Sequence, residues 1–116
     1  MKIISSEEFL ALPSGVLYCN YSSCCISNLN IKGDTIVHGG DTPSDYLYQS
    51  LIGDVESDDS SDMFDTLTDA EDNGTEFKLE LDCTMRDGIF DNTRMYAIYS
   101  IDDVKQLISQ LTNLLK

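Results

Sequence analysis

Residues 94–115 read RMYAIYSIDDVKQLISQLTNLL, and the hydrophobic period changes in the middle of this stretch. Residues 94–100 are a nearly continuous apolar and aromatic run, which is typical of a strand. Ser100 can cap a following helix, with Asp103 three residues on. The apolar residues of that helix form one stripe: Ile101, Val104, Leu107, Ile108, Leu111, Leu114 and Leu115. The chain therefore combines strands with an amphipathic C-terminal helix.

Helix signals also occur nearer the N-terminus. Ser5 and Glu8 have the spacing of a capping box, and Pro13 ends the short helix that would follow. Thr42 and Pro43 have the character of an N-cap and a first helical residue, so residues 42–52 are predicted to be helical as well.

Strand signals lie between and after these helices. Residues 15–22 and 26–32 are rich in β-branched, aromatic or alternating apolar residues, and residues 35–37 form a short third run. Residues 77–83 alternate strictly between apolar and polar side chains, which predicts a half-buried strand. We expect one α+β domain over residues 1–116, with a mainly antiparallel sheet of four to five strands, a short N-terminal helix, a central acidic helix or loop and the C-terminal amphipathic helix.

The charge is concentrated in the middle of the chain. The protein has 21 acids and 7 bases in 116 residues, a net charge of −14, and the 45 residues 33–77 contain thirteen acids and no base. Binding to nucleic acid or to an anionic membrane requires lysine and arginine to neutralise phosphates. We therefore expect neither as a direct ligand, and no run of residues has the length of a membrane span. A basic partner or a cation is favoured instead.

Nine of the acids lie in residues 54–72, and their spacing is helical. If the segment is helical, six aspartates fall within an arc of about 80°, and the apolar residues Met63, Phe64, Leu67 and Ala70 lie opposite them. Asn73-Gly74 would supply the C-cap. Helix is most strongly indicated over residues 62–72. We describe residues 54–76 as an acidic, partly mobile insert, with residues 57–61 as its mobile part.

The charge density of such a helix resembles that of a nucleic acid backbone. Nineteen helical residues span about 28 Å, so nine carboxylates give about one charge per 3 Å, and a DNA strand carries one per about 3.4 Å. We therefore predict a surface that binds the nucleic-acid-binding face of a basic protein. The predicted partner-binding residues are Asp54, Asp58, Asp59, Asp62, Asp65, Asp69, Glu71 and Asp72.

Two alternatives remain open for the acidic segment. Residues 69–80 have the ligand spacing of an EF-hand calcium loop, with Gly74 at its sixth position, although the strand-like alternation of residues 77–83 opposes this interpretation. The candidate ligands of that calcium- or cation-binding module are Asp69, Glu71, Asn73 and Glu80. Alternatively, the segment is a passive, solubilising loop of an accessory protein, since residues 57–62 have the composition of a solvated loop.

Other chemistry has little support in the sequence. Residues 1–8 lack the apolar core of a signal peptide, so we expect a cytoplasmic protein with reduced cysteines and no cofactor. A zinc site would have to use Cys24, Cys25, Cys83 and His38, but their spacing matches no closed zinc pattern. His38 stands alone, and no nucleophile, phosphate-loop or paired-histidine motif accompanies it. We expect a protein that is not an enzyme.

Two segments carry a resemblance. Leu12-Pro-Ser-Gly-Val-Leu-Tyr18 and Asn28-Leu-Asn-Ile-Lys-Gly-Asp-Thr35 resemble small uncharacterised acidic proteins of bacteriophages and prophages. That resemblance implies a context: phages encode small acidic inhibitors of host defence, including anti-CRISPR proteins, and several of these imitate DNA. It implies a location in the host cytoplasm and a basic, nucleic-acid-binding host protein or complex as partner. It implies no catalytic residues and leaves the oligomeric state open.

Overall fold

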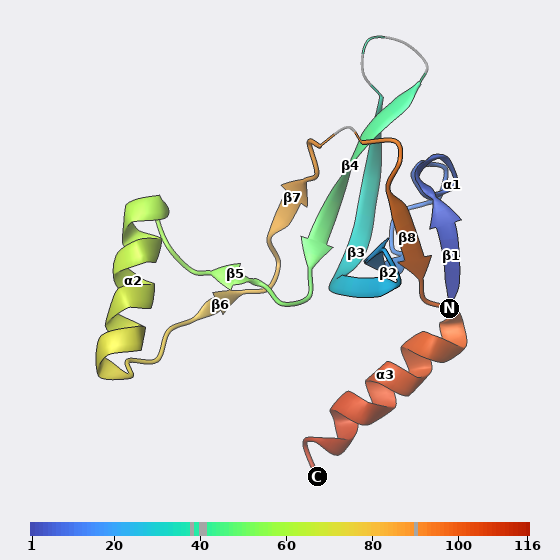
Figure 1. Ribbon diagram of the computed structural model, residues 1–116. Coiled ribbons are helices and arrows are strands. Elements are labelled where there is room, and N and C mark those ends of the chain that lie inside the picture. Colours follow the sequence, from blue (N-terminus) through green and yellow to red (C-terminus); the bar gives the residue numbers. More distant parts are fainter. Residues whose placement is uncertain (38, 40–41, 90) are drawn as a thin grey trace.

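The chain folds around one curved antiparallel sheet (Figure 1). The structure is a computed structural model, and it describes residues 1–37, 39, 42–89 and 91–116. The strand order is β1-β8-β2-β3-β4-β7. The bounds of these strands are β1 Lys2–Ser5, β2 Leu17–Ser22, β3 Cys25–Val37, β4 Pro43–Ser50, β7 Thr84–Arg86 and β8 Met95–Ile98.

Three helices and a second, two-stranded sheet complete the described part of the chain. The helices are α1 Ser6–Leu10, α2 Ser60–Asn73 and α3 Ile101–Asn113. The small sheet pairs β5 Asp54–Val55 with β6 Leu79–Glu80. The α+β class and the mainly antiparallel sheet are confirmed. The main sheet has six strands, and three of them were not expected as strands: β1 at the edge beside β8, and β4 and β7 at the other edge.

The core is a cluster of aromatic rings against one face of the sheet. Phe9 of α1 is completely buried, and its ring stacks on Tyr96 at a centroid distance of 3.9 Å. Tyr18 and Tyr46 meet Phe9 edge to face at 4.7 and 4.9 Å. Such ring pairs contribute specific geometry in addition to apolar burial. The short helix α1 therefore acts as a plug, and Ser5 caps it as expected by accepting a hydrogen bond from the Glu8 backbone N–H.

Strand β3 is longer than predicted, because Gly33-Asp34 does not end it. The ladder with β4 shifts register between Lys32 and Thr35, which accommodates these two residues as an irregularity within one strand. A Cβ atom on Gly33 would lie 3.1 Å from the Leu47 Cβ atom, so glycine allows the close approach of β4. Lys32, 1% exposed, donates hydrogen bonds to the Leu12 and Gly33 carbonyls and to Thr35 Oγ1.

The predicted helix over residues 42–52 is wrong. Residues 43–50 form β4, which lies between β3 and β7. Pro43 is the first residue of this strand, a position where its missing N–H costs no ladder hydrogen bond. Tyr46 is buried in the aromatic core, and Tyr48, two residues on, packs against the same cluster. Tertiary burial of this alternating pair outweighs the local capping signals.

The half-buried strand predicted over residues 77–83 is also wrong. Only β6, Leu79–Glu80, has strand geometry there, and it pairs with β5 instead of joining the main sheet. The apolar side chains remain exposed: Phe77 by 43%, Leu79 by 51% and Leu81 by 55%. Alternation predicted the local extended conformation, but no covering layer is present.

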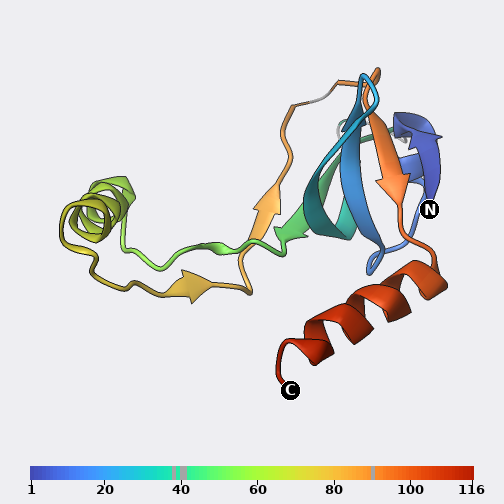
Figure 2. The same cartoon turned by 60° about the horizontal axis from the view of Figure 1, so that its bottom comes forward.

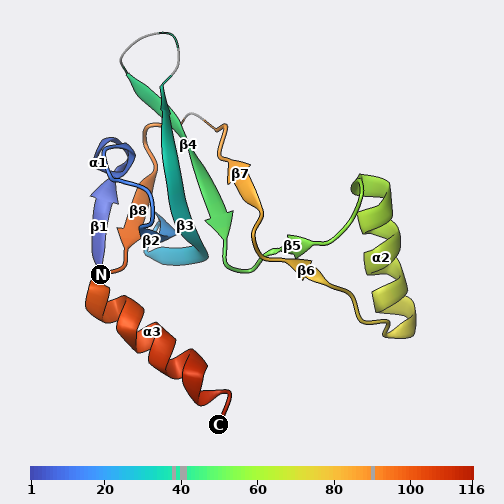
Figure 3. The same ribbon diagram turned by 180° about the vertical axis from the view of Figure 1, so that it is seen from behind.

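The molecule is extended, because β5 and β6 form an arm that leads away from the main sheet and carries α2 at its end (Figures 1 and 2). The radius of gyration is 16.8 Å, whereas a compact chain of this length has about 13 Å. Helix α3 leaves the end of β8 and runs along the bottom of the sheet, at the opposite end from the start of β4 (Figure 3).

Candidate functional site: an acidic helix on a projecting arm

The arm is a two-stranded ribbon with a defined base. Asp54 pairs with Glu80 and Val55 with Leu79, and the Glu56 N–H donates to the Lys78 carbonyl at 3.0 Å. Gly53 turns the chain out of β4 with φ +84°, a backbone conformation that favours glycine. The side-chain amide of Gln49 in β4 donates to the Leu81 carbonyl. These contacts connect the arm to the main sheet.

Helix α2 is capped at both ends. Asp59 is the N-cap, and its carboxylate accepts a hydrogen bond from the Asp62 N–H at 2.7 Å. Gly74 is the left-handed C-cap predicted from the sequence, with φ +67° and its N–H bonded to the Ala70 carbonyl at 3.0 Å. Acids at the N-terminus interact favourably with the helix dipole. The helix therefore begins two residues before the predicted Asp62.

The acidic stripe lies on one side of α2. Along the helix, Asp62, Asp65, Asp69 and Asp72 follow the spacing that places side chains within an arc of about 80°. No basic residue occurs in the last turn. Asn73 donates to Asp69 Oδ1 at 2.8 Å, and this hydrogen bond lowers the pKa of Asp69. Within the described residues, no carboxylate of α2 has an ion-pair partner.

The other predicted partner-binding residues lie off this stripe. Asp54 is in β5 at the base of the arm, and Asp59 uses its carboxylate as the N-cap. Glu71 lies near the apolar side of the helix. Asp58 precedes the helix, where its backbone N–H donates to Asp62 Oδ2 at 2.9 Å. Asp58 and Asp59 therefore lie beside Asp62 at the start of the stripe, whereas Asp54 and Glu71 are separated from it.

The apolar side of α2 is uncovered. No residue of the helix is buried, and Phe64 is 69% and Leu67 39% exposed. The sequence correctly placed these residues opposite the acids, but it predicted nothing to cover them. The helix thus presents a dense negative stripe and an open apolar stripe on one projecting element.

The calcium interpretation requires a loop that the structure does not form. Asp69, Glu71 and Asn73 are in the last turns of α2, and Glu80 is in β6. Asp69 and Glu71 are two helical residues apart, so their side chains diverge by about 200° around the axis. In an EF-hand loop, the corresponding residues converge on one ion.

The zinc interpretation gains no support from the described residues. Cys24 and Cys25 are exposed, Cys83 is half-buried, and His38 lies outside the described residues. No group of three or more metal-ligating side chains occurs among the residues that the structure describes. The fourth cysteine, Cys19, is buried, with its Sγ atom 3.7 Å from the Tyr99 hydroxyl oxygen.

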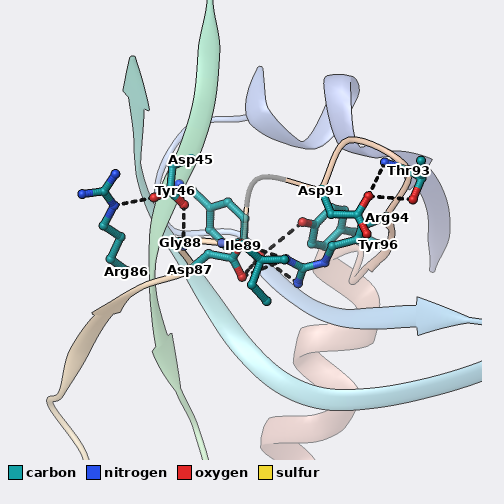
Figure 4. A network of polar contacts seen from close by, with 10 residues as sticks. All are labelled: Asp45, Tyr46, Arg86, Asp87, Gly88, Ile89, Asp91, Thr93, Arg94 and Tyr96. Carbon is teal, nitrogen blue, oxygen red and sulfur yellow. Dashed lines mark hydrogen bonds and ion pairs between the residues drawn. The ribbon is translucent and has the colours of Figure 1, made fainter. Parts of the chain in front are cut away.

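A polar network that the sequence did not reveal connects β4, β7 and β8 (Figure 4). Asp45 has no exposed side-chain surface; it forms an ion pair with Arg86 and accepts the backbone N–H groups of Tyr46 and Gly88. Burial alone would raise the pKa of Asp45, but these hydrogen bonds hold the pKa below its ordinary value. The network fastens β7 and the turn after it to the buried end of β4.

A second ion pair lies beside this one. Arg94 donates to both carboxylate oxygens of Asp87, at 2.9 and 2.7 Å, and Asp87 also accepts the Tyr46 hydroxyl at 3.2 Å. Burial alone would lower the pKa of Arg94, but Asp87 holds it above its ordinary value. Burial likewise raises the pKa of Tyr46. Both tyrosine and arginine are thereby fixed in their protonated forms, which suits a structural or binding role.

Comparisons with protein-family models, curated proteins and solved structures found no match to this chain. The resemblance to phage proteins therefore remains an expectation from the sequence. In the described part of the chain, no helix combines the length and apolar character needed to cross a bilayer.

Proposed function

We propose that this protein is a non-enzymatic inhibitor that uses α2 to bind the basic, nucleic-acid-binding surface of another protein. The observation that carries the proposal is the position of the acidic stripe: it is on a capped helix at the end of an arm, away from the sheet. A passive loop has no reason to be capped at both ends and to be presented in this way.

The mechanism is competition for lysine and arginine side chains that normally contact phosphates. The stripe aspartates are free of internal ion pairs within the described residues, so binding a basic partner does not have to break an ion pair. The net charge of −14 would also speed association with a basic surface and make it sensitive to salt. The exposed ring of Phe64 adds apolar contact area, which phosphates alone do not offer.

The expected partner is a basic host protein or complex that binds nucleic acid, and the expected setting is the cytoplasm of a bacterial host. The resemblance to acidic phage proteins supports an anti-defence role, such as that of an anti-CRISPR protein. The calcium-binding alternative is disfavoured, because its candidate ligands lie in α2 and β6 and not in one loop. In the experiment below, equal displacement of DNA by the native protein and the test variant would support the alternative of a passive, solubilising segment.

The experiment compares three proteins as immobilised bait and as soluble competitor. The test variant carries Asp65→Lys, Asp69→Lys and Asp72→Lys; lysines toward the C-terminus of α2 suit the helix dipole, so the helix should persist. The matched control carries the same change in charge outside α2, through the substitutions Glu7→Lys, Asp82→Lys and Asp102→Lys. Each protein is first immobilised to capture partners from a bacterial lysate at low and moderate salt. The captured proteins are then purified and tested for binding to duplex DNA, with each of the three proteins added in solution as competitor.

The native protein and the control should capture a DNA-binding protein and displace its DNA, with competition that weakens as salt rises. The test variant should lose displacement by at least about tenfold. Equal displacement by the test variant would contradict the proposal and leave the segment with a passive role.

A further inference from the structure

The curved sheet has an open pocket next to the aromatic core. Its volume is about 380 Å³, which lies within the size range of small-molecule sites. Tyr18 and Tyr46 line it on the side of the core, whereas three asparagines line it on the side of β2 and β3: Asn20, Asn28 and Asn30. Phe9 packs against Tyr18 and Tyr46, so the pocket lies directly beside the ring cluster.

A bulge between β2 and β3 shapes the pocket wall. Cys19 pairs with Leu29 and Asn20 pairs with Ser27, so Asn28 is the extra residue. Asn28 has φ +59°, a left-handed conformation that asparagine tolerates better than most residues. Bulges often redirect side chains next to binding sites. Here the bulge sets Asn20 and Asn28 at the same pocket.

The pocket contains an unsatisfied hydrogen-bond acceptor. Asn20 Oδ1 is buried and has no hydrogen-bond partner among the described residues. A buried polar atom without a partner destabilises the fold, and most such atoms in folded proteins are paired. Because this oxygen is buried, a ligand in the pocket reaches it only when the Asn20 side chain rotates, and a hydrogen bond made then would remove that destabilising effect.

The charge in the pocket favours a cation. Arg94 and Asp87 both line the pocket. Arg94 donates to both carboxylate oxygens of Asp87, so the charges of these two residues cancel. Asp54 lines the pocket at the point where the arm leaves the sheet. Among the described residues, its carboxylate accepts one hydrogen bond, from the N–H of Val55, and has no ion-pair partner. Asp54 therefore contributes an unbalanced negative charge, and the field of the whole acidic protein acts in the same direction.

We propose that this pocket receives an arginine side chain of the basic partner. The guanidinium group has several donors in one plane, which suits the Asp54 carboxylate and the oxygen of Asn20. Tyr48 is a further pocket residue, and a tyrosine ring can stack with a guanidinium group. This inference rests on the proposed function: α2 would contact the partner over a wide area, and the pocket would select arginine over lysine at one point.

The test is a titration of the ¹⁵N-labelled full chain with Nα-acetyl-arginine amide, observed by NMR. A probe of this size is expected to bind with Kd on the order of 1 mM. The side-chain amide signals of Asn20 and Asn28 should shift in a saturable manner. The neutral isostere Nα-acetyl-citrulline amide and the lysine analogue should each bind at least about tenfold more weakly.

Asp54→Asn should weaken arginine binding about tenfold, since it removes a charge-assisted hydrogen bond. Asp82→Asn, the same charge change at an exposed acid outside both α2 and the pocket, should leave it unchanged. The inference is overturned if citrulline binds as well as arginine, if both variants respond equally, or if no saturable shift appears up to about 50 mM, well above the expected Kd.

The two proposals fail separately. The triple lysine variant of α2 should retain arginine binding in the pocket, because Asp65, Asp69 and Asp72 are not pocket residues. If that variant still displaces DNA from its partner, the proposed function of α2 is wrong, whatever the pocket does. If the pocket ignores arginine while α2 remains necessary, only the pocket inference is wrong.

Discussion

The main sheet and helix α2 are organised by opposite principles. The sheet encloses Phe9 completely, surrounds it with tyrosine rings and satisfies the buried carboxylate of Asp45. Helix α2 buries no residue and depends on its two caps, Asp59 and Gly74. The comparison teaches that the stability of this protein and its proposed interaction surface reside in different parts of the chain. Substitutions can therefore test the two parts independently.

The largest effect is expected at the aromatic plug. Phe9→Ala should lower the free energy of unfolding by about 3–5 kcal/mol, because it removes a fully buried ring and leaves a cavity between Tyr96, Tyr18 and Tyr46. Urea denaturation measures this loss. A loss below about 1 kcal/mol would show that the sheet does not depend on its plug.

The next effect is expected at the buried carboxylate. Asp45→Asn should cost about 2–3 kcal/mol at pH 7, since it removes the ion pair with Arg86 and weakens the acceptor for Gly88. The native pKa of Asp45 is lowered, so its contribution is fully present above the unfolded-state pKa and disappears as the pH falls through the folded-state pKa.

The pH dependence provides the control for this prediction. Between pH 7 and pH 3, the native protein should lose more stability than Asp45→Asn does, and the difference between the two should shrink below about pH 4. Parallel pH profiles in urea denaturation would argue against a stabilising role for the ionised carboxylate.

A smaller, local effect is expected at the C-cap of α2. Gly74→Ala should destabilise the end of the helix by about 1 kcal/mol, because φ +67° is unfavourable for alanine. No atom would lie within 4 Å of the new Cβ, so the cost is purely conformational. NMR chemical shifts should report fraying over residues 70–73, while the urea midpoint of the sheet stays constant. Thr68→Ala, on an exposed helical position, is the matched control.

The smallest effect on the sheet is expected from removing α2 altogether. Glu56 and Lys78 are hydrogen-bonded neighbours in the arm, so Asn-Gly can replace residues 57–77 as a tight hairpin turn. The unfolding free energy should change by less than about 0.5 kcal/mol, because α2 buries nothing. Partner binding should be lost. A marked loss of sheet stability would show that the two regions are coupled.

The sequence predicted the features that are fixed locally. The C-terminal capping box of Ser100 and Asp103, the Ser5 cap of α1 and the Gly74 C-cap are all present, since each depends on residues within a few positions. Residues 42–52 misled because Pro43 and Tyr46 are placed by strand pairing with distant segments. Such pairing leaves no local signal.

The candidate site shows the same division. The helical period of the stripe was readable from Asp62, Asp65 and Asp69, because it depends only on spacing. The arm was not readable, since the alternation at Leu79 and Leu81 is identical for a covered and an uncovered strand. The pocket required the bulge at Asn28, which is a property of the β2–β3 register.

Helix α3 has a consequence for colloidal behaviour. Its apolar stripe lines a cavity of about 530 Å³ against the sheet without filling it, and Leu115, just beyond the helix end, is 88% exposed. At neutral pH the charge of −14 keeps molecules apart despite this adhesive surface. The isoelectric point expected from the sequence is about 4.1, so near pH 4 the net charge is close to zero and the same surface becomes free to join molecules together. The negative charge of the chain therefore also prevents aggregation, so the protein should be purified and stored well above that pH.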